Sequence, residues 1–175
     1  AMDITTQQAG WFLILTLPFC VWSAWSDMKR MKIPNRATDG LALVYVVAGA
    51  ALVLWGSDPD WGWSDYFWRY AHFAVVLALG LGLNALNMMG AGDVKFLASA
   101  APFVAVGDIG AVLMLYLACL LATFVLHRIA RATPLRNLSP DWESWTTGKR
   151  FPMGLAFGTT LSAYFLLGWL DLPLL

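Results

Sequence analysis

Long apolar runs separated by short polar segments dominate the pattern of this chain. A helix needs about 20 apolar residues to cross a bilayer, and in lipid the helix satisfies all its own backbone groups. We therefore predict an all-α membrane protein, a polytopic bundle of six transmembrane helices forming a single domain over residues 1–175. The predicted spans are residues 11–26, 40–55, 70–89, 94–106, 109–127 and 151–170.

The fourth run is the weakest of the six. Its apolar core, Phe96 to Val106, has eleven residues, about half of what a crossing helix needs. It must therefore recruit Val94 and Lys95, thin the bilayer locally, or dip into the membrane without crossing. Pro102 within it predicts a kink.

Composition supports the membrane class. The chain is 59% hydrophobic and 13% charged, with a mean hydropathy of +0.64, whereas soluble domains are about one quarter charged. The first run has no basic residue before it, and it carries bulky Trp22 and Trp25 where a signal peptide has small residues, so we expect it to be retained. Cys20 and Cys119 both lie in apolar runs, which predicts neither a disulfide nor a zinc site. We expect the chain to contact the lipid bilayer and to bind no nucleic acid.

The charges are sorted along the chain, although the net charge is zero. Ten of the eleven Lys and Arg residues follow the first, third or fifth run, where alternating spans emerge on one side. The positive-inside rule makes that side cytoplasmic, with both termini outside and an inner loop over residues 128–150. The basic residues are Lys29, Arg30, Lys32, Arg36, Lys95, Arg128, Arg131, Arg136, Lys149 and Arg150. The outer side carries Asp3, Asp58, Asp60, Asp65, Asp108 and Asp171, accompanied only by Arg69.

Aromatic residues gather in two of the loops. We interpret Trp55, Trp61, Trp63 and Trp68 as an outer interfacial belt, and Trp142 and Trp145 as residues of an inner surface segment. His72 and His127 each stand alone near the end of a run, and we predict that both are interfacial.

Two acids stand at the inner boundary, one just after the first run and one just before the fourth. These are Asp27 and Asp93, and packing the first helix beside the fourth would bring them together. Two adjacent carboxylates share one proton, which is the arrangement of aspartic proteases. One carboxylate would take a proton from water while the other polarises the scissile carbonyl.

Glycines flank the second acid in Gly90-Ala91-Gly92-Asp93. We predict that these glycines adopt backbone angles that other residues do not adopt, and that they leave space for an extended substrate strand. The alternative is that they form only a tight turn, with Asp93 as an N-cap. Asp27 is open to a second interpretation too, as an ion-pair partner of nearby basic residues.

These motifs together resemble the type IV prepilin peptidases, intramembrane aspartic proteases of the Gly-x-Gly-Asp class. The match lies in Asp27 followed by Ile33-Pro34-Asn35, in Gly90 to Ala98, and in Pro152-Met153-Gly154. The resemblance implies that Asp27 and Asp93 are the catalytic pair, at the cytoplasmic face of the inner membrane. The residues expected to shape the site are Gly90, Gly92, Lys95, Pro34, Asn35, Pro152 and Gly154.

The resemblance also implies the substrate: prepilin precursors with a short basic leader ending in Gly, followed by an apolar helix. Larger members carry two Cys-x-x-Cys pairs and methylate the new N-terminus, and this chain has no such pairs. We therefore expect the short, peptidase-only branch associated with Flp pili, with no methyl transfer. Asp39, Asp141 and Glu143 are the inner acids available for contacts with a basic leader.

Two hypotheses from other classes remain at this stage. A small transporter or proton-relay protein would use both acids as titrating groups, which are expected near the midplane. A pilus-assembly platform subunit would explain six helices but leaves the paired acids without a role. We predict no metal and no cofactor, because a pair that shares a proton needs no ion.

Overall fold

A computed structural model describes residues 2–148 and 150–173, and every regular element within them is helical. Lys149 of the predicted inner loop lies outside the described residues. The principal helices are α1 (Thr6–Arg30), α2 (Asn35–Val44), α3 (Ala50–Trp55), α4 (Trp63–Trp68), α5 (Tyr70–Ala85), α6 (Ala91–Ala100), α7 (Ile109–Ala132) and α8 (Met153–Trp169). A π-helical turn, η1 (Tyr45–Gly49), joins α2 to α3, and short 3₁₀ turns η2 (Ala101–Phe103) and η3 (Val106–Asp108) join α6 to α7. Two more, η4 (Pro134–Leu138) and η5 (Glu143–Trp145), lie between α7 and α8.

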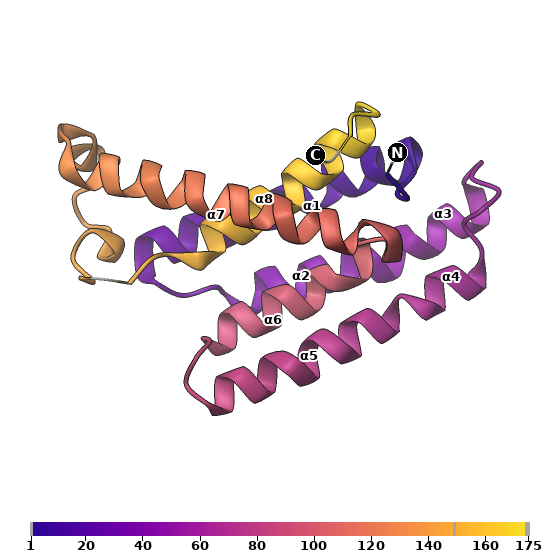
Figure 1. The fold of residues 1–175 in the computed structure, drawn as a ribbon, viewed down its shortest axis with the longest axis horizontal. Helices are drawn as coiled ribbons and strands as arrows, with labels where there is room; N and C mark the ends of the chain where they lie inside the picture. Colours follow the sequence, from indigo (N-terminus) through magenta and orange to yellow (C-terminus); the bar gives the residue numbers. More distant parts are fainter. Residues whose placement is uncertain (1, 149, 174–175) are drawn as a thin grey trace.

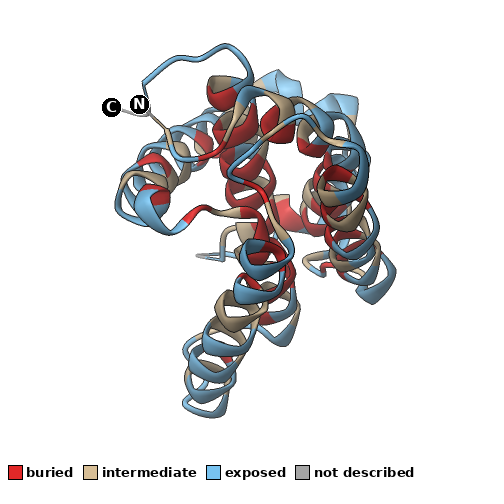
Figure 2. Ribbon diagram, turned by 90° about the vertical axis from the view of Figure 1, so that its right-hand side faces the viewer, coloured by how far each residue is buried: buried red, intermediate tan, exposed pale blue. Residues whose placement is uncertain are grey.

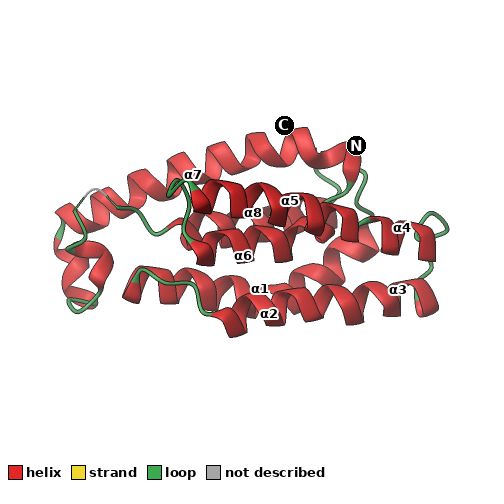
Figure 3. Ribbon diagram, turned by 90° about the horizontal axis from the view of Figure 1, so that it is seen from below, coloured by secondary structure: helices red, strands yellow, loops and turns green. Residues whose placement is uncertain are grey.

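The helices run roughly along one axis in an antiparallel arrangement (Figures 1 and 3). One end of the bundle holds the α1–α2 link, the α5–α6 turn and the α7–α8 connection (Figure 1). The opposite end holds both termini, the α3–α4 link and the α6–α7 link. The predicted inner and outer loops therefore gather at opposite ends, which we call the basic end and the acidic end.

Four helical segments among the described residues are long and apolar enough to cross a membrane: Thr6–Arg30, Asn35–Trp55, Trp63–Ala85 and Val106–Ala132. The last helix, Met153–Trp169, is apolar but shorter. Helix α6 has ten residues and continues only into the 3₁₀ turn that contains Pro102. Each predicted apolar run is thus mainly helical, while the number of membrane crossings stays a prediction.

Helices α1 and α8 pack closely because small residues line their contact. A Cβ atom added to Gly158 would lie 2.8 Å from the carbonyl oxygen of Cys20, so only glycine permits this approach. Small residues bring membrane helices together in this way when no hydrophobic effect drives their association. The buried residues follow the inward faces of the helices, and the outward faces are exposed (Figure 2). This contact determines how the start of α8 meets the end of α1.

The acidic end corrects the predicted aromatic belt. Trp55, Trp63 and Trp68 are exposed, but Trp61 is buried, with Arg69 over its ring at 4.7 Å. Its indole N–H donates to the carbonyl of Gly49 at 3.1 Å, at the end of the π-helical turn. Trp61 can be buried because its indole N–H has this hydrogen-bond acceptor, which a buried Trp side chain needs.

A buried polar network at the acidic end was not predicted from the sequence. Asp108 accepts hydrogen bonds from the Tyr164 hydroxyl at 2.8 Å and from the backbone N–H groups of Asp3 and Ile4. Arg69 donates to the carbonyl of Phe103 at 3.1 Å. These contacts tie the N-terminus and α8 to the α6–α7 link, far from the basic end.

Candidate active site

Asp27 lies in the last turn of α1, at the basic end of the bundle. The helix continues to Arg30 and ends at Met31, whose N–H makes the last helical bond, to the Asp27 carbonyl, and whose left-handed backbone (φ 51°) ends the helix. The Asp27 side chain itself is buried. It therefore points into the protein, although the residues that follow it are polar and basic.

The start of α8 supplies the hydrogen-bond partner of Asp27. The backbone N–H of Gly154 donates to Asp27 Oδ2 at 2.7 Å. Pro152 is the N-cap residue of α8, so Gly154 is in the first turn, where backbone N–H groups lack helical partners. A carboxylate at such a position is stabilised by the free N–H and by the helix dipole. The Pro-x-Gly element of the sequence thus contacts the first acid directly.

Asp93 lies in the first turn of α6, whose N-cap is Gly90. Its half-buried side chain accepts a hydrogen bond from the Gly90 backbone N–H. Burial away from water raises the pKa of Asp93 above its ordinary value, and the Gly90 hydrogen bond partly opposes this shift. Asp93 is therefore the third residue of the helix and not its N-cap.

The structure corrects the predicted reason for the two glycines. Gly90 has a φ of −69°, which any residue adopts, and Gly92 lies within the helix. The left-handed position of this turn belongs to Asn87, with φ 58°. Gly90 provides space, because an added Cβ would lie 3.0 Å from Asp93 Oδ2, whereas a Cβ added at Gly92 would make an ordinary contact 3.4 Å from Ile33 Cβ.

Ile33 connects the surroundings of the two acids. Its side chain packs against Gly92, the residue before Asp93, and against Gly154, the residue that donates to Asp27. Asp93 also acts electrostatically on Asp27, because the two carboxyl groups carry like charge. The structure therefore places at one end of the bundle two acids that are far apart in sequence, on α1 and α6. Repulsion between like charges makes the doubly ionised state less favourable than the state that keeps one proton.

The remaining predicted residues tie the flanking elements together. Pro34 is the N-cap residue of α2, and Asn35 is the first residue of that helix. Lys95 of α6 donates through Nζ to Asn35 Oδ1 at 2.8 Å, on the exposed surface. This bond links the start of α2 to the start of α6, beside Asp93.

Three residues near the acids were missed as contributors to the site: Ile33, Gly158 and Tyr116. Ile33 was seen only as part of a motif, although a buried apolar residue within a basic loop is itself a signal. Gly158 lies four residues after Gly154, a spacing typical of close helix contacts. Tyr116 of α7 interacts electrostatically with Asp93, and nothing in its local sequence indicated that contact.

His127 differs from the prediction, since it is buried and not interfacial. Its ring stacks on Trp145 with centroids 5.1 Å apart, and Phe151 contacts its edge. The connection between α7 and α8 folds back over the end of α7 and covers it. The three inner acids, Asp39, Asp141 and Glu143, are exposed. Among the described residues, no group of three or more His, Cys, Asp or Glu side chains is placed to hold a metal ion.

Comparison with known protein families decides among the classes considered. A model of the type IV leader peptidase family matches residues 14–127, about two thirds of the chain. The chain belongs to the type IV leader peptidase family. No curated protein and no solved structure matches it. The matched region contains both Asp27 and Asp93, and family membership makes the protein a peptidase with prepilin-type substrates.

Proposed function

We propose that this leader peptidase is an aspartic endopeptidase that removes the short basic leader from type IV or Flp-like prepilins. Asp27 and Asp93 would act together on one water molecule at the cytoplasmic face of the inner membrane. The observation that supports this proposal is the placement of the two acids at the same end of the bundle, on α1 and α6. Ile33 packs against Gly92, the neighbour of Asp93, and against Gly154, which donates to Asp27.

The chemistry follows from one shared proton. The ionised carboxylate accepts a proton from water as the water oxygen bonds to the scissile carbonyl carbon. The protonated carboxyl donates to the carbonyl oxygen, which gives a neutral tetrahedral intermediate. When the C–N bond breaks, the leaving amine takes a proton from the carboxyl that received one from water. The carbonyl re-forms as its hydroxyl proton returns to the other carboxylate, so the pair again holds one proton. The pair titrates as a unit, so its two apparent pKa values belong to neither residue alone.

The position of the pair fits a substrate with a polar leader and an apolar helix. Lys29 and Arg30 lie in the last turn of α1, next to Asp27. By the positive-inside rule this end is cytoplasmic, and both termini are then outside. A leader junction at the membrane surface would meet the acids there while the following helix stays in the bilayer.

Methyl transfer is not assigned to these residues. The two cysteines lie on separate helices, Cys20 on α1 and Cys119 on α7, and neither belongs to a Cys-x-x-Cys pair. The transporter and platform hypotheses lose support because the chain belongs to a peptidase family and both acids lie at one end of the bundle.

The test is co-expression with a Flp-type prepilin, followed by the mass of the mature pilin. We expect a product cleaved after the leader Gly, with no added methyl group, only when the peptidase is present. An unprocessed precursor beside abundant membrane-inserted peptidase would contradict the proposal.

A further inference from the structure

An apolar groove of about 360 Å³ lies between α5 and α6 on one side and α7 and α8 on the other. Residues from all four sides line it, among them Val76 of α5, Leu97 of α6, Ala101 of η2, Val112 of α7 and Phe157 of α8. The segments that contain α5 and α7, Trp63–Ala85 and Val106–Ala132, are the least buried of the four long apolar segments. Inside a bilayer the groove is therefore open to an apolar chain that approaches laterally.

The floor of this groove leads to Asp93. Three α6 residues that line it, Phe96, Leu97 and Ala100, stand 3, 4 and 7 positions after Asp93, so they share one helix face with it. Ala101 and Val104 line the groove further along, in the 3₁₀ turn η2 and just after it. Tyr116, which interacts electrostatically with Asp93, lines the groove from α7. The groove is thus an apolar path that ends at an acid.

The exposure of the two acids indicates the same side of approach. Asp27 is buried, with Gly154 donating to it, whereas Asp93 is half-buried. A scissile carbonyl would therefore reach the pair from the side of Asp93.

We propose that this groove binds the apolar helix of the precursor and places the leader junction beside Asp93. The inference rests on the proposed function. The occupant is an apolar helix with the scissile junction at its N-terminal end, because the groove is apolar along its length and its α6 lining begins three residues after Asp93. The small residues Ala100 and Ala101, at the end of α6 and the start of η2, let a helix approach closely. Along α6 the lining from Phe96 to Ala100 covers about 6 Å, about one turn of a helix.

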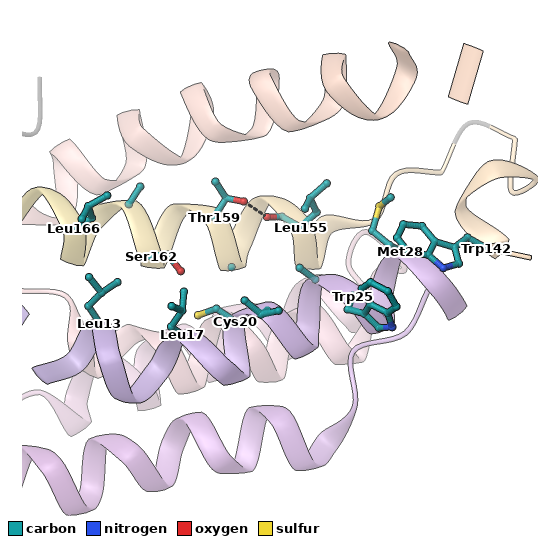
Figure 4. Close-up of a pocket in the computed structure, with 14 residues that line it drawn as sticks. Leu13, Leu17, Cys20, Trp25, Met28, Trp142, Leu155, Thr159, Ser162 and Leu166 are labelled. Atoms are coloured by element: carbon teal, nitrogen blue, oxygen red, sulfur yellow. Dashed lines mark hydrogen bonds between the residues drawn. The ribbon is translucent and has the colours of Figure 1, made fainter. Parts of the chain in front are cut away.

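A second apolar groove, of about 740 Å³, lies between α1 and α8 and provides a control. Figure 4 shows Leu13, Leu17 and Cys20 of α1 facing Ser162 and Leu166 of α8 across it. Its end near the acids is bordered by Trp25 and Trp142, whose rings lie 5.1 Å apart edge to face. On this side the start of α8 packs directly on Asp27, so the second groove does not open onto the carboxylate.

The same substitution in the two grooves tests the proposal. Val76→Trp and Val112→Trp fill the first groove, and Val21→Trp places an identical side chain in the second. With a purified prepilin in proteoliposomes, we expect the first two variants to raise KM at least tenfold with kcat within twofold. Val21→Trp should change neither constant. Unchanged KM in both groove variants, or a fall in kcat alone, would overturn the docking proposal.

Cross-linking provides a readout that does not depend on how the Trp variants fold. A photoreactive phenylalanine is placed at Val112 or at Val21 in the Asp93→Asn background, which keeps the precursor intact. We expect an adduct between the Val112 position and the apolar helix of the precursor, and none from Val21. An adduct only from Val21, or from neither, would overturn the groove assignment. If one of these two contrary results is found while the parent enzyme still cleaves the precursor, the docking proposal is wrong and the proposed function stands.

Discussion

The backbone N–H of Gly154 and the carboxylate of Asp27 are joined by a 2.7 Å hydrogen bond that connects the first turn of α8 to the last turn of α1. A Cβ added at Gly154 would lie 3.0 Å from Asp27 Cβ and 3.2 Å from Ile33 Cδ1. The residue is therefore glycine because its missing side chain leaves room for the acid, while the N–H that binds the acid is one that any residue except proline would supply.

Gly154→Ala should reduce leader cleavage about tenfold or more, which corresponds to about 1.4 kcal/mol in the activation free energy. The added methyl group has to push Asp27 or Ile33 aside. The measurement is the initial rate of prepilin cleavage at equal peptidase levels. Gly110→Ala is the matched control, because Gly110 is also the second residue of its helix and nothing lies within 4 Å of an added Cβ. Equal rates for the two variants would count against this role of Gly154.

Gly158→Ala should lower the thermal stability of the protein in detergent. Its Cβ would lie 2.8 Å from a backbone carbonyl, which cannot move as a side-chain tip does. A loss of about 1 kcal/mol lowers Tm by about 2–4 °C for a chain of this size. Gly82→Ala, in the last turn of α5 with open space around it, should leave Tm unchanged or raise it. A Tm for Gly158→Ala equal to that of the parent would show that α1 and α8 separate at little cost.

The apolar runs and their spacing predicted helices in the right parts of the chain, and the boundary positions of Asp27 and Asp93 predicted a shared end. What the sequence could not predict depends on tertiary contacts. Trp61 sits among exposed tryptophans in sequence, yet it alone reaches the Gly49 carbonyl and is buried. His127 looked interfacial because its own helix ends nearby, but a later segment carrying Trp145 covers it.

The role of the glycines shows the same limit. A Gly-Ala-Gly turn suggested unusual backbone angles, yet the left-handed residue is Asn87, held in a turn where the Asn84 amide donates to the Met89 carbonyl at 2.8 Å. Local sequence does not distinguish a glycine needed for its backbone from one needed for the space beside it. That distinction requires the position of the Asp93 carboxylate, whose Oδ2 would lie 3.0 Å from a Cβ added at Gly90.

The Lys95–Asn35 hydrogen bond predicts a measurable coupling. Lys95→Ala and Asn35→Ala should each lower the cleavage rate by a similar factor, because each removes the same link between α2 and α6. The double variant should be no worse than either single one, with a coupling free energy of about 0.5–1 kcal/mol. Lys32→Ala removes another exposed basic residue nearby and should have little effect. Additive losses in the double variant would show that the two side chains act separately.

The raised pKa of Asp93 predicts a pH-dependent effect on stability. Burial makes the ionised form costly, so the folded state binds this proton more tightly than the unfolded state does. Between the unfolded and folded pKa values the free energy of unfolding therefore falls as the pH rises, and it stays lowered above that window. Asp93→Asn, which has no charge to bury, should exceed the parent in Tm at pH 7.5.

That difference in Tm should shrink as the pH is lowered to about 4, near the ordinary pKa of an aspartate. Asp60→Asn, at an exposed acid of the acidic end, should show no such difference. A Tm advantage of Asp93→Asn that grows on acidification would have the wrong sign and would contradict the burial argument.

The most direct test of the central claim is the cleavage rate of a Flp-type prepilin by Asp27→Asn and by Asp93→Asn. Removal of either member of an acid–base pair costs about 10²- to 10⁴-fold. We therefore expect each single variant to lose cleavage by at least a hundredfold while accumulating in the membrane at parental levels, with Asp60→Asn fully active. If either variant at Asp27 or Asp93 cleaves at the parental rate, the two acids do not form the catalytic pair.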